Sequence, residues 1–141
     1  MNALKVKILS LVLFVLLPIC LVFSQPKAVI HPMEYDFGEI IEDSVVTKNF
    51  VITNKGSELL KITDIKASCG CTAVVAGKNE LKPGDSTDIK VSFNSEGKSG
   101  KQTKTVTVKT NDPVNTVIRL AFTGNVVKKD LKIGKIEKLK D

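Results

Sequence analysis

Two cysteines separated by one glycine, Cys69-Gly70-Cys71, are the residues whose types and spacing could carry chemistry in this sequence. Residues i and i+2 of a strand share a face, and their Cα atoms lie about 6.6 Å apart at roughly 3.3 Å per residue. A disulfide usually needs about 4.4–6.8 Å between its Cα atoms. The pair can therefore form a disulfide, especially if Gly70 bends the backbone through a positive φ.

Three roles are open to this pair. A structural disulfide or two packed thiols is the role we expect, because cysteine is often simply a small buried residue. A disulfide here would close a very small ring and gain little stability from chain entropy. A strained, partly exposed disulfide is easily reduced, which is the physical case for thiol–disulfide redox work. Two thiolates could also hold Cu(I), which prefers soft ligands, whereas zinc usually requires four ligands and no second cysteine pair follows.

The rest of the sequence is poor in catalytic residues. His31, the sole histidine, precedes a proline close to the amino end, where we expect a solvated linker. The acidic residues Asp36, Glu39, Glu42 and Asp43 lack the spacing of a calcium loop. Phosphate loops, dinucleotide fingerprints and nucleophile elbows are absent from the sequence. We therefore expect neither an enzyme nor a cofactor.

Nucleic acid is an unsuitable partner for this chain. The formal net charge of +6 is modest, and one tyrosine with no tryptophan offers no platform on which bases could stack. We expect no nucleic-acid binding.

Residues 1–24 have the pattern of a secretory signal peptide. Lys5 and Lys7 precede the uncharged apolar run 8–23, and small residues precede a cleavage point before Gln25. The run is shorter than the roughly 20 residues of a spanning helix. We expect an exported protein, periplasmic or extracellular, that meets the membrane only through the signal peptide before cleavage.

Cys20 follows the apolar stretch and raises a lipoprotein as an alternative. Ile19 fills the preceding position, where lipoprotein signals usually carry a small residue, so the cleaved signal is favoured. Cleavage leaves Cys69 and Cys71 as the two cysteines, in a compartment where disulfides persist.

Beyond the signal the hydrophobic pattern has a period of two. Short alternating runs are separated by turns such as Lys82-Pro83-Gly84-Asp85, and no window keeps a helical period. About seven short antiparallel strands predict an all-β, immunoglobulin-like sandwich over residues 34–127, between an N-terminal linker (25–33) and a basic C-terminal tail (128–141). The predicted interior consists of Phe50, Ile52, Leu60, Ile62, Ile89, Val91, Phe93, Val106, Val108, Ile118, Leu120 and Phe122.

Several motifs resemble a secreted bacterial family known as domain of unknown function 1573. The most distinctive is Ser68-Cys69-Gly70-Cys71-Thr72, and four further segments match: Tyr35-Asp36-Phe37-Gly38-Glu39-Ile40, Phe50-Val51-Ile52-Thr53-Asn54-Lys55-Gly56, Leu81-Lys82-Pro83-Gly84-Asp85 and Thr110-Asn111-Asp112-Pro113. The last is also similar to a turn of the hydin/abnormal-spindle (ASH) type immunoglobulin-like domains. The resemblance implies an immunoglobulin-like sandwich and brings no established activity.

The sequence departs from this family at two places. Lys48 stands where the family often has a histidine, and Ala73 follows Thr72 where a proline often lies nearby. The first departure weakens the idea that a histidine assists the cysteines.

Two functions follow from these observations. The first is a non-catalytic secreted or cell-envelope module that binds a protein partner, since the open edges of a sandwich can pair with a partner's strand. The alternative is thiol–disulfide redox chemistry or copper handling through Cys69 and Cys71. We expect the first, because strained cysteines are only probabilistic evidence of function.

Overall fold

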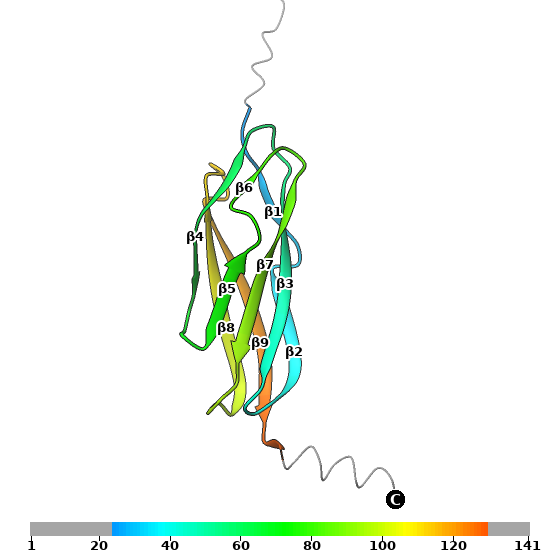
Figure 1. Ribbon diagram of the computed structural model, residues 1–141, viewed down its shortest axis with the longest axis vertical. Helices are drawn as coiled ribbons and strands as arrows, with labels where there is room; N and C mark the ends of the chain where they lie inside the picture. Colours follow the sequence, from blue (N-terminus) through cyan, green and yellow to red (C-terminus); the bar gives the residue numbers. More distant parts are fainter. Residues whose placement is uncertain (1–23, 130–141) are drawn as a thin grey trace, which may run out of the picture.

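The computed structural model describes residues 24–129, which form a sandwich of two β-sheets (Figure 1). None of the helices in this range is long and apolar enough to cross a membrane. The predicted signal peptide up to residue 23 and the tail from residue 130 onward lie outside the described residues. The strands are β1 (Ala28–Ile30), β2 (Glu34–Ile41), β3 (Val45–Asn54), β4 (Leu60–Ala67), β5 (Thr72–Ala76), β6 (Glu80–Leu81), β7 (Ser86–Asn94), β8 (Gly100–Thr110) and β9 (Val117–Val127).

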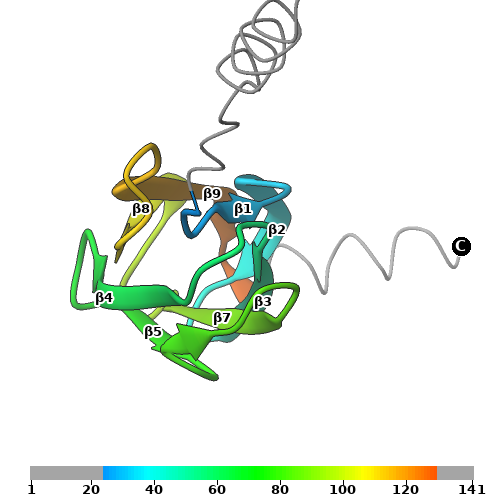
Figure 2. The same cartoon turned by 90° about the horizontal axis from the view of Figure 1, so that it is seen from above.

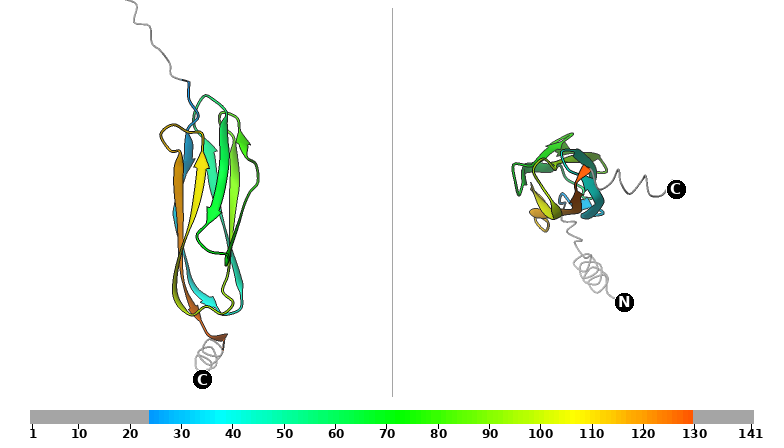
Figure 3. Two further views of the ribbon diagram at one scale, coloured as in Figure 1. Left: turned by 90° about the vertical axis from the view of Figure 1, so that its left-hand side faces the viewer. Right: turned by 90° about the horizontal axis from the view of Figure 1, so that it is seen from below.

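The two sheets have the strand orders β1-β3-β7-β5 and β2-β9-β8-β4-β6. Seen from above, they face each other across a shared interior (Figure 2). The side view in the left panel of Figure 3 shows an elongated molecule with its strands along the long axis. The predicted all-β, immunoglobulin-like class is confirmed, with two very short strands, β1 and β6, in addition to the seven longer ones.

The interior is built from the alternating apolar residues of both sheets. Each of the twelve residues predicted to face it is buried, with at most 8% of its surface exposed. Phe93 of one sheet and Phe122 of the other lie with ring centroids 5.6 Å apart, so the aromatic rings join the two layers. The period-two pattern was sufficient to identify these positions because one face of each strand must be apolar.

The first strand of the sandwich begins before the predicted boundary. Residues 28–30 form β1 on β3, and the chain then crosses at Pro32 to the other sheet and continues as β2. The segment predicted as a linker, 25–33, therefore contains part of the sandwich. Residues 28–30 are held in the sandwich in part because the carboxylate of Asp112 accepts a hydrogen bond from the Ala28 N–H at 2.8 Å. This contact joins residues that are 84 positions apart in the sequence.

β2 runs parallel to β9, whereas the other paired strands are antiparallel. This pairing differs from the purely antiparallel prediction, and it follows from the crossing, which enters the second sheet in the direction of β9. β2 bulges at Phe37 and Gly38, where the ladder to β9 shifts register. A Cβ added to Gly124 would collide with the side chain of Ile40, so this glycine permits the close approach of the two strands.

Candidate functional site

The Cys69-Gly70-Cys71 segment forms the turn between β4 and β5, where the chain passes from one sheet to the other. The Sγ atoms lie 2.06 Å apart and the Cα atoms 5.3 Å apart, so the two residues form a disulfide. The Thr72 N–H donates to the Cys69 carbonyl at 3.2 Å, which closes the turn. The Asn94 N–H donates to the Cys71 carbonyl at 2.9 Å, which fixes the turn to the end of β7.

Gly70 does not have a positive φ, the bend that would have assisted the disulfide. A Cβ at Gly70 would meet no atom within 4 Å, so the turn itself brings the Cα atoms to bonding distance. The pair lies between the end of β4 and the start of β5. It does not lie at the end of the sandwich, because Ser68 bonds to Thr105 in the middle of β8.

Both cysteines are half-buried. Cys71 packs against the edge of the core, and Sγ of Cys69 lies 3.4 Å from the hydroxyl of the buried Thr72. Within residues 24–129, no cluster of three or more histidine, cysteine or acidic residues could hold a metal ion. The geometry is therefore that of a partly accessible disulfide which also fastens the start of β5.

β5 is an edge strand, and it begins directly after the disulfide. It pairs with β7 on one side. The Gly77 N–H donates to Asp88 at 2.9 Å, so the odd-numbered residues of β5 bond to β7 and the even-numbered ones direct their N–H and C=O away from it. Val74 and Ala76 therefore present their backbone groups along an open edge. Val75, between them, is 65% exposed.

The other edges of the sandwich carry features that discourage strand pairing. β2 is bulged and bears three acidic residues, and the open part of β3 carries Lys48. β1 has three residues and is covered in part by Asp112, β6 has two residues, and β4 has a bulge next to Asp64. Charges, bulges and short length are the usual protections of an edge. β5 has none of them: its sequence is Thr-Ala-Val-Val-Ala.

Sequence reasoning missed β5. Its five residues contain two alanines and no alternation with charged residues, so the period-two pattern does not mark them as a strand. The signal that could have revealed it is the adjacent pair Val74-Val75, since β-branched residues favour strands.

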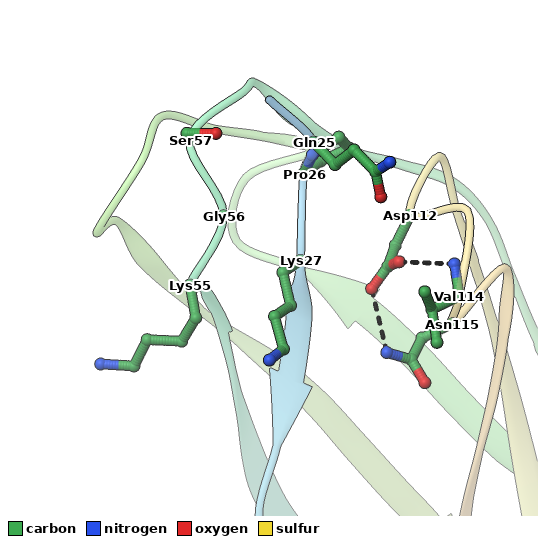
Figure 4. Close-up of a pocket in the computed structure, with 9 residues that line it drawn as sticks. All are labelled: Gln25, Pro26, Lys27, Lys55, Gly56, Ser57, Asp112, Val114 and Asn115. Carbon is green, nitrogen blue, oxygen red and sulfur yellow. Dashed lines mark hydrogen bonds between the residues drawn. The ribbon is translucent and has the colours of Figure 1, made fainter. Parts of the chain in front are cut away.

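Asp112 lies in the turn between β8 and β9 and bonds there to Val114 and Asn115 (Figure 4), and it also bonds to Ala28 of β1. Its carboxylate is 1% exposed and accepts hydrogen bonds from the N–H groups of Ala28 and Val114 and from the Asn115 amide. Burial raises the pKa of Asp112, but the hydrogen bonds from Ala28, Asn115 and Val114 outweigh it and hold the pKa below its usual value. A hollow of about 530 Å³ lies beside this residue. Because each polar atom of Asp112 is already occupied by the fold, we assign it a structural role.

The remaining residues weighed in the sequence lie apart from the disulfide. His31 is exposed in the crossing between β1 and β2. Asp36 accepts a hydrogen bond from the Gly38 N–H within the β2 bulge, and this bond, followed by one from Thr123, lowers its pKa. The Lys48 ammonium lies 4.3 Å from the ring centroid of Tyr35, which explains how a lysine is accommodated on the inward-facing side of β3.

Known proteins confirm the fold. The sandwich is similar to a protein of unknown function from Porphyromonas gingivalis W83 (TM-score 0.66, 19% identity, 75% of this chain), of which it spans only 50%. It is also similar to the ASH/PapD-like domain 7 of human CEP192 (TM-score 0.59, 9% identity, 74% of this chain and 88% of that chain).

An enzyme is also among the similar structures. The secreted serine protease VesC from Vibrio cholerae has a TM-score of 0.52 at 12% identity, and the match covers 74% of this chain but 23% of the protease. At such identities the likeness concerns the fold alone. Among curated proteins, no sequence matches this chain.

The sequence profile of one family matches residues 28–126. This range begins at the first residue of β1 and ends one residue before the end of β9, so it covers the sandwich as the structure defines it. The disulfide turn, the β5 edge and the Asp112 turn all fall inside it. The chain therefore belongs to the family described as protein of unknown function (DUF1573).

Proposed function

We propose that this protein is an exported, non-catalytic module that binds an extended segment of a partner protein along the edge of β5. The observation that supports it most is the contrast among the edges. β5 alone, among the strand edges within residues 24–129, combines five residues with no charge, no proline and no bulge. A partner strand would bond to the backbone of Val74 and Ala76 and would place side chains beside Val75.

The disulfide supports this role without taking part in chemistry. It fixes the residue that precedes β5, and the Cys71 carbonyl accepts a hydrogen bond from Asn94 of β7. An edge strand held in this way loses less conformational freedom when a partner pairs with it.

Proline substitution tests the edge with little change to the fold. Ala76→Pro removes an N–H that faces away from β7, so it blocks an added strand and leaves the β5–β7 ladder intact. Asn49→Pro is the matched control, because Asn49 directs its N–H away from β7 along the open part of β3. Both variants should unfold close to the wild type.

Photocrosslinking from position 75 supplies the binding readout. A photoreactive residue at Val75 should yield a partner adduct in the producing cells, and mass spectrometry would identify the partner. The adduct should disappear with Ala76→Pro and persist with Asn49→Pro. An adduct that survives Ala76→Pro, or that forms equally from position 47 on β3, would contradict binding along β5.

A half-exposed disulfide that closes a very small loop also supports thiol–disulfide exchange as a second candidate function. The thiolate of a partner dithiol would attack one Sγ and release the other cysteine as a thiolate. The second partner thiol would then break the mixed disulfide, which leaves the partner oxidised and Cys69 and Cys71 reduced. The same reduced pair is the species that could hold Cu(I).

The double variant Cys69→Ser with Cys71→Ser separates the two candidates. For a structural disulfide, it should lower the free energy of unfolding by about 1–3 kcal/mol, because the closed loop is short. Neither wild type nor variant should then reduce insulin or bind copper tightly. A wild type that does either, while the variant does neither at unchanged stability, would make exchange or copper handling the function.

A further inference from the structure

A groove of about 290 Å³ separates the edge of β1 from the start of β9. Figure 2 shows these two strands next to each other at the end of the molecule where β1 begins. They belong to different sheets, so the groove is an opening in the side of the sandwich. It lies away from β5, which is at the opposite edge of its sheet.

The β9 wall of this groove has backbone groups that no neighbouring strand covers. The Thr110 N–H donates to the Thr116 carbonyl at 2.9 Å, so the even-numbered residues of β9 bond to β8 and the odd-numbered ones face the β2 side. Ala121 donates its N–H to Met33 at 2.9 Å, and the β2 ladder starts there. Val117 and Arg119 precede that point, so within the described residues no strand pairs with their outward groups.

The groove has an apolar lining and one closed end. Ile30 and Ile118, both buried, line it together with the exposed side chains of Met33 and Val117. The chain crossing at His31 closes one end, where it passes between the sheets. A strand that entered from the end of the molecule would run along β9 and would have to stop at the crossing.

The charges around the groove have one sign. Lys27 and Arg119 line it, and no acidic residue within residues 24–129 does. Arg119 is the sole arginine of a sequence that otherwise uses lysine for its cations. It makes no ion pair with a residue in the range 24–129. Arginine differs from lysine in binding a carboxylate through two parallel N–H groups.

We infer that this groove binds the C-terminal end of a partner chain. The last residues add to β9 as a short parallel strand, bond to the backbone of Val117 and Arg119, and place one apolar side chain against Ile118. The terminal carboxylate lies at the closed end, next to the guanidinium of Arg119. The closed end favours a terminus over an internal acidic side chain, because an internal segment would have to leave the sheet at the crossing.

Two peptide pools test this inference with the exported protein as the producing cells process it. One pool contains random hexapeptides with free C-terminal carboxylates, and the other contains the same sequences as C-terminal amides. The free-acid pool should be enriched on the protein and the amide pool should not. For the enriched peptides, Arg119→Gln should weaken binding about tenfold or more, the loss expected for one charge-assisted hydrogen bond. Lys90→Gln, the same change of charge on β7, should leave the affinity unchanged.

Amide chemical shifts locate the bound peptide. They should change at Ala28–Ile30 and at Val117–Arg119, and remain unchanged along β5. Equal capture of both pools, no capture of either, an equal effect of the two variants, or shifts at β5 would each overturn the inference. Because the readout is confined to the β1–β9 groove, its failure leaves the β5 proposal standing, and the crosslinking result at β5 does not depend on Arg119.

Discussion

Replacing Asp112 should remove the link between the first strand and the turn that joins β8 to β9. The carboxylate accepts from the N–H groups of Ala28 and Val114, each at 2.8 Å, and from the Asn115 amide at 3.0 Å. Asp112→Ala leaves the buried Ala28 N–H without an acceptor, which costs about 1–3 kcal/mol, and loses two other bonds worth about 0.5–1.5 kcal/mol each. We expect a total loss of about 3 kcal/mol, a large part of the 5–15 kcal/mol typical of a domain.

The loss should depend on pH in a definite direction. Because the pKa of Asp112 is lowered in the folded protein, the unfolded chain binds the proton more readily, and acid favours unfolding. The stabilisation is complete above the unfolded-state value of about 3.9 and is lost as the pH falls through the lower, folded-state value. The difference between wild type and Asp112→Ala should therefore be largest at neutral pH and shrink below about pH 4.

Urea denaturation at pH 7 and at pH 3 measures both effects. Asp112→Asn keeps the size of the side chain but turns an amide toward N–H donors, so it should lose stability and show the same flattened acid response. Asp88→Ala, the removal of an exposed carboxylate on β7, is the control and should change little. If Asp112→Ala cost less than about 1 kcal/mol at pH 7, or cost the same at both pH values, β1 would not depend on this carboxylate.

Three further outcomes test the fold and the export signal. Phe93→Ala should cost about 3–5 kcal/mol, as large core truncations do, and a melting temperature within a degree or two of wild type would contradict its burial. Gly124→Ala should destabilise measurably because its Cβ would meet Ile40, while Gly70→Ala should be nearly neutral in the same denaturation assay; equal losses would refute the close approach. If the chain is exported as we propose, sequencing the amino terminus of the mature protein should give Gln25, and a chain that still begins at Met1 would refute the signal peptide.

The interior could be predicted from the sequence because burial of one face of a strand produces an alternating pattern among neighbouring residues. Alternation along each strand identified the residues from Phe50 to Phe122 that the structure buries, and the apolar residues of β4 change parity between Ile62 and Ile65, where the ladder has its bulge. These features depend on neighbours in sequence, so a single chain is sufficient to show them.

Contacts between residues that are distant in the sequence produce no such pattern and could not be predicted. The N–H of Ala28 meets Asp112 across most of the chain, and nothing in the residues 25–33 indicates that they are held. β5 was missed because its five residues show no alternation between apolar and charged side chains. The cysteine spacing predicted that a disulfide was possible, but the carbonyl bonds that place the turn between two sheets come from Asn94 and Thr72.

The parallel pairing of β2 and β9 gives this sandwich a mechanical property. The described chain begins at one end of the long axis and leaves at the other (Figure 1), and β2, the first long strand, runs parallel to β9, the last strand. If the two ends were pulled apart and the short β1 detached from β3, β2 and β9 would slide along each other, and the load would be shared by all the hydrogen bonds of their ladder at once. A ladder loaded in this way must break as a unit, whereas the antiparallel β8–β9 hairpin, pulled open at one end, would unzip one bond at a time.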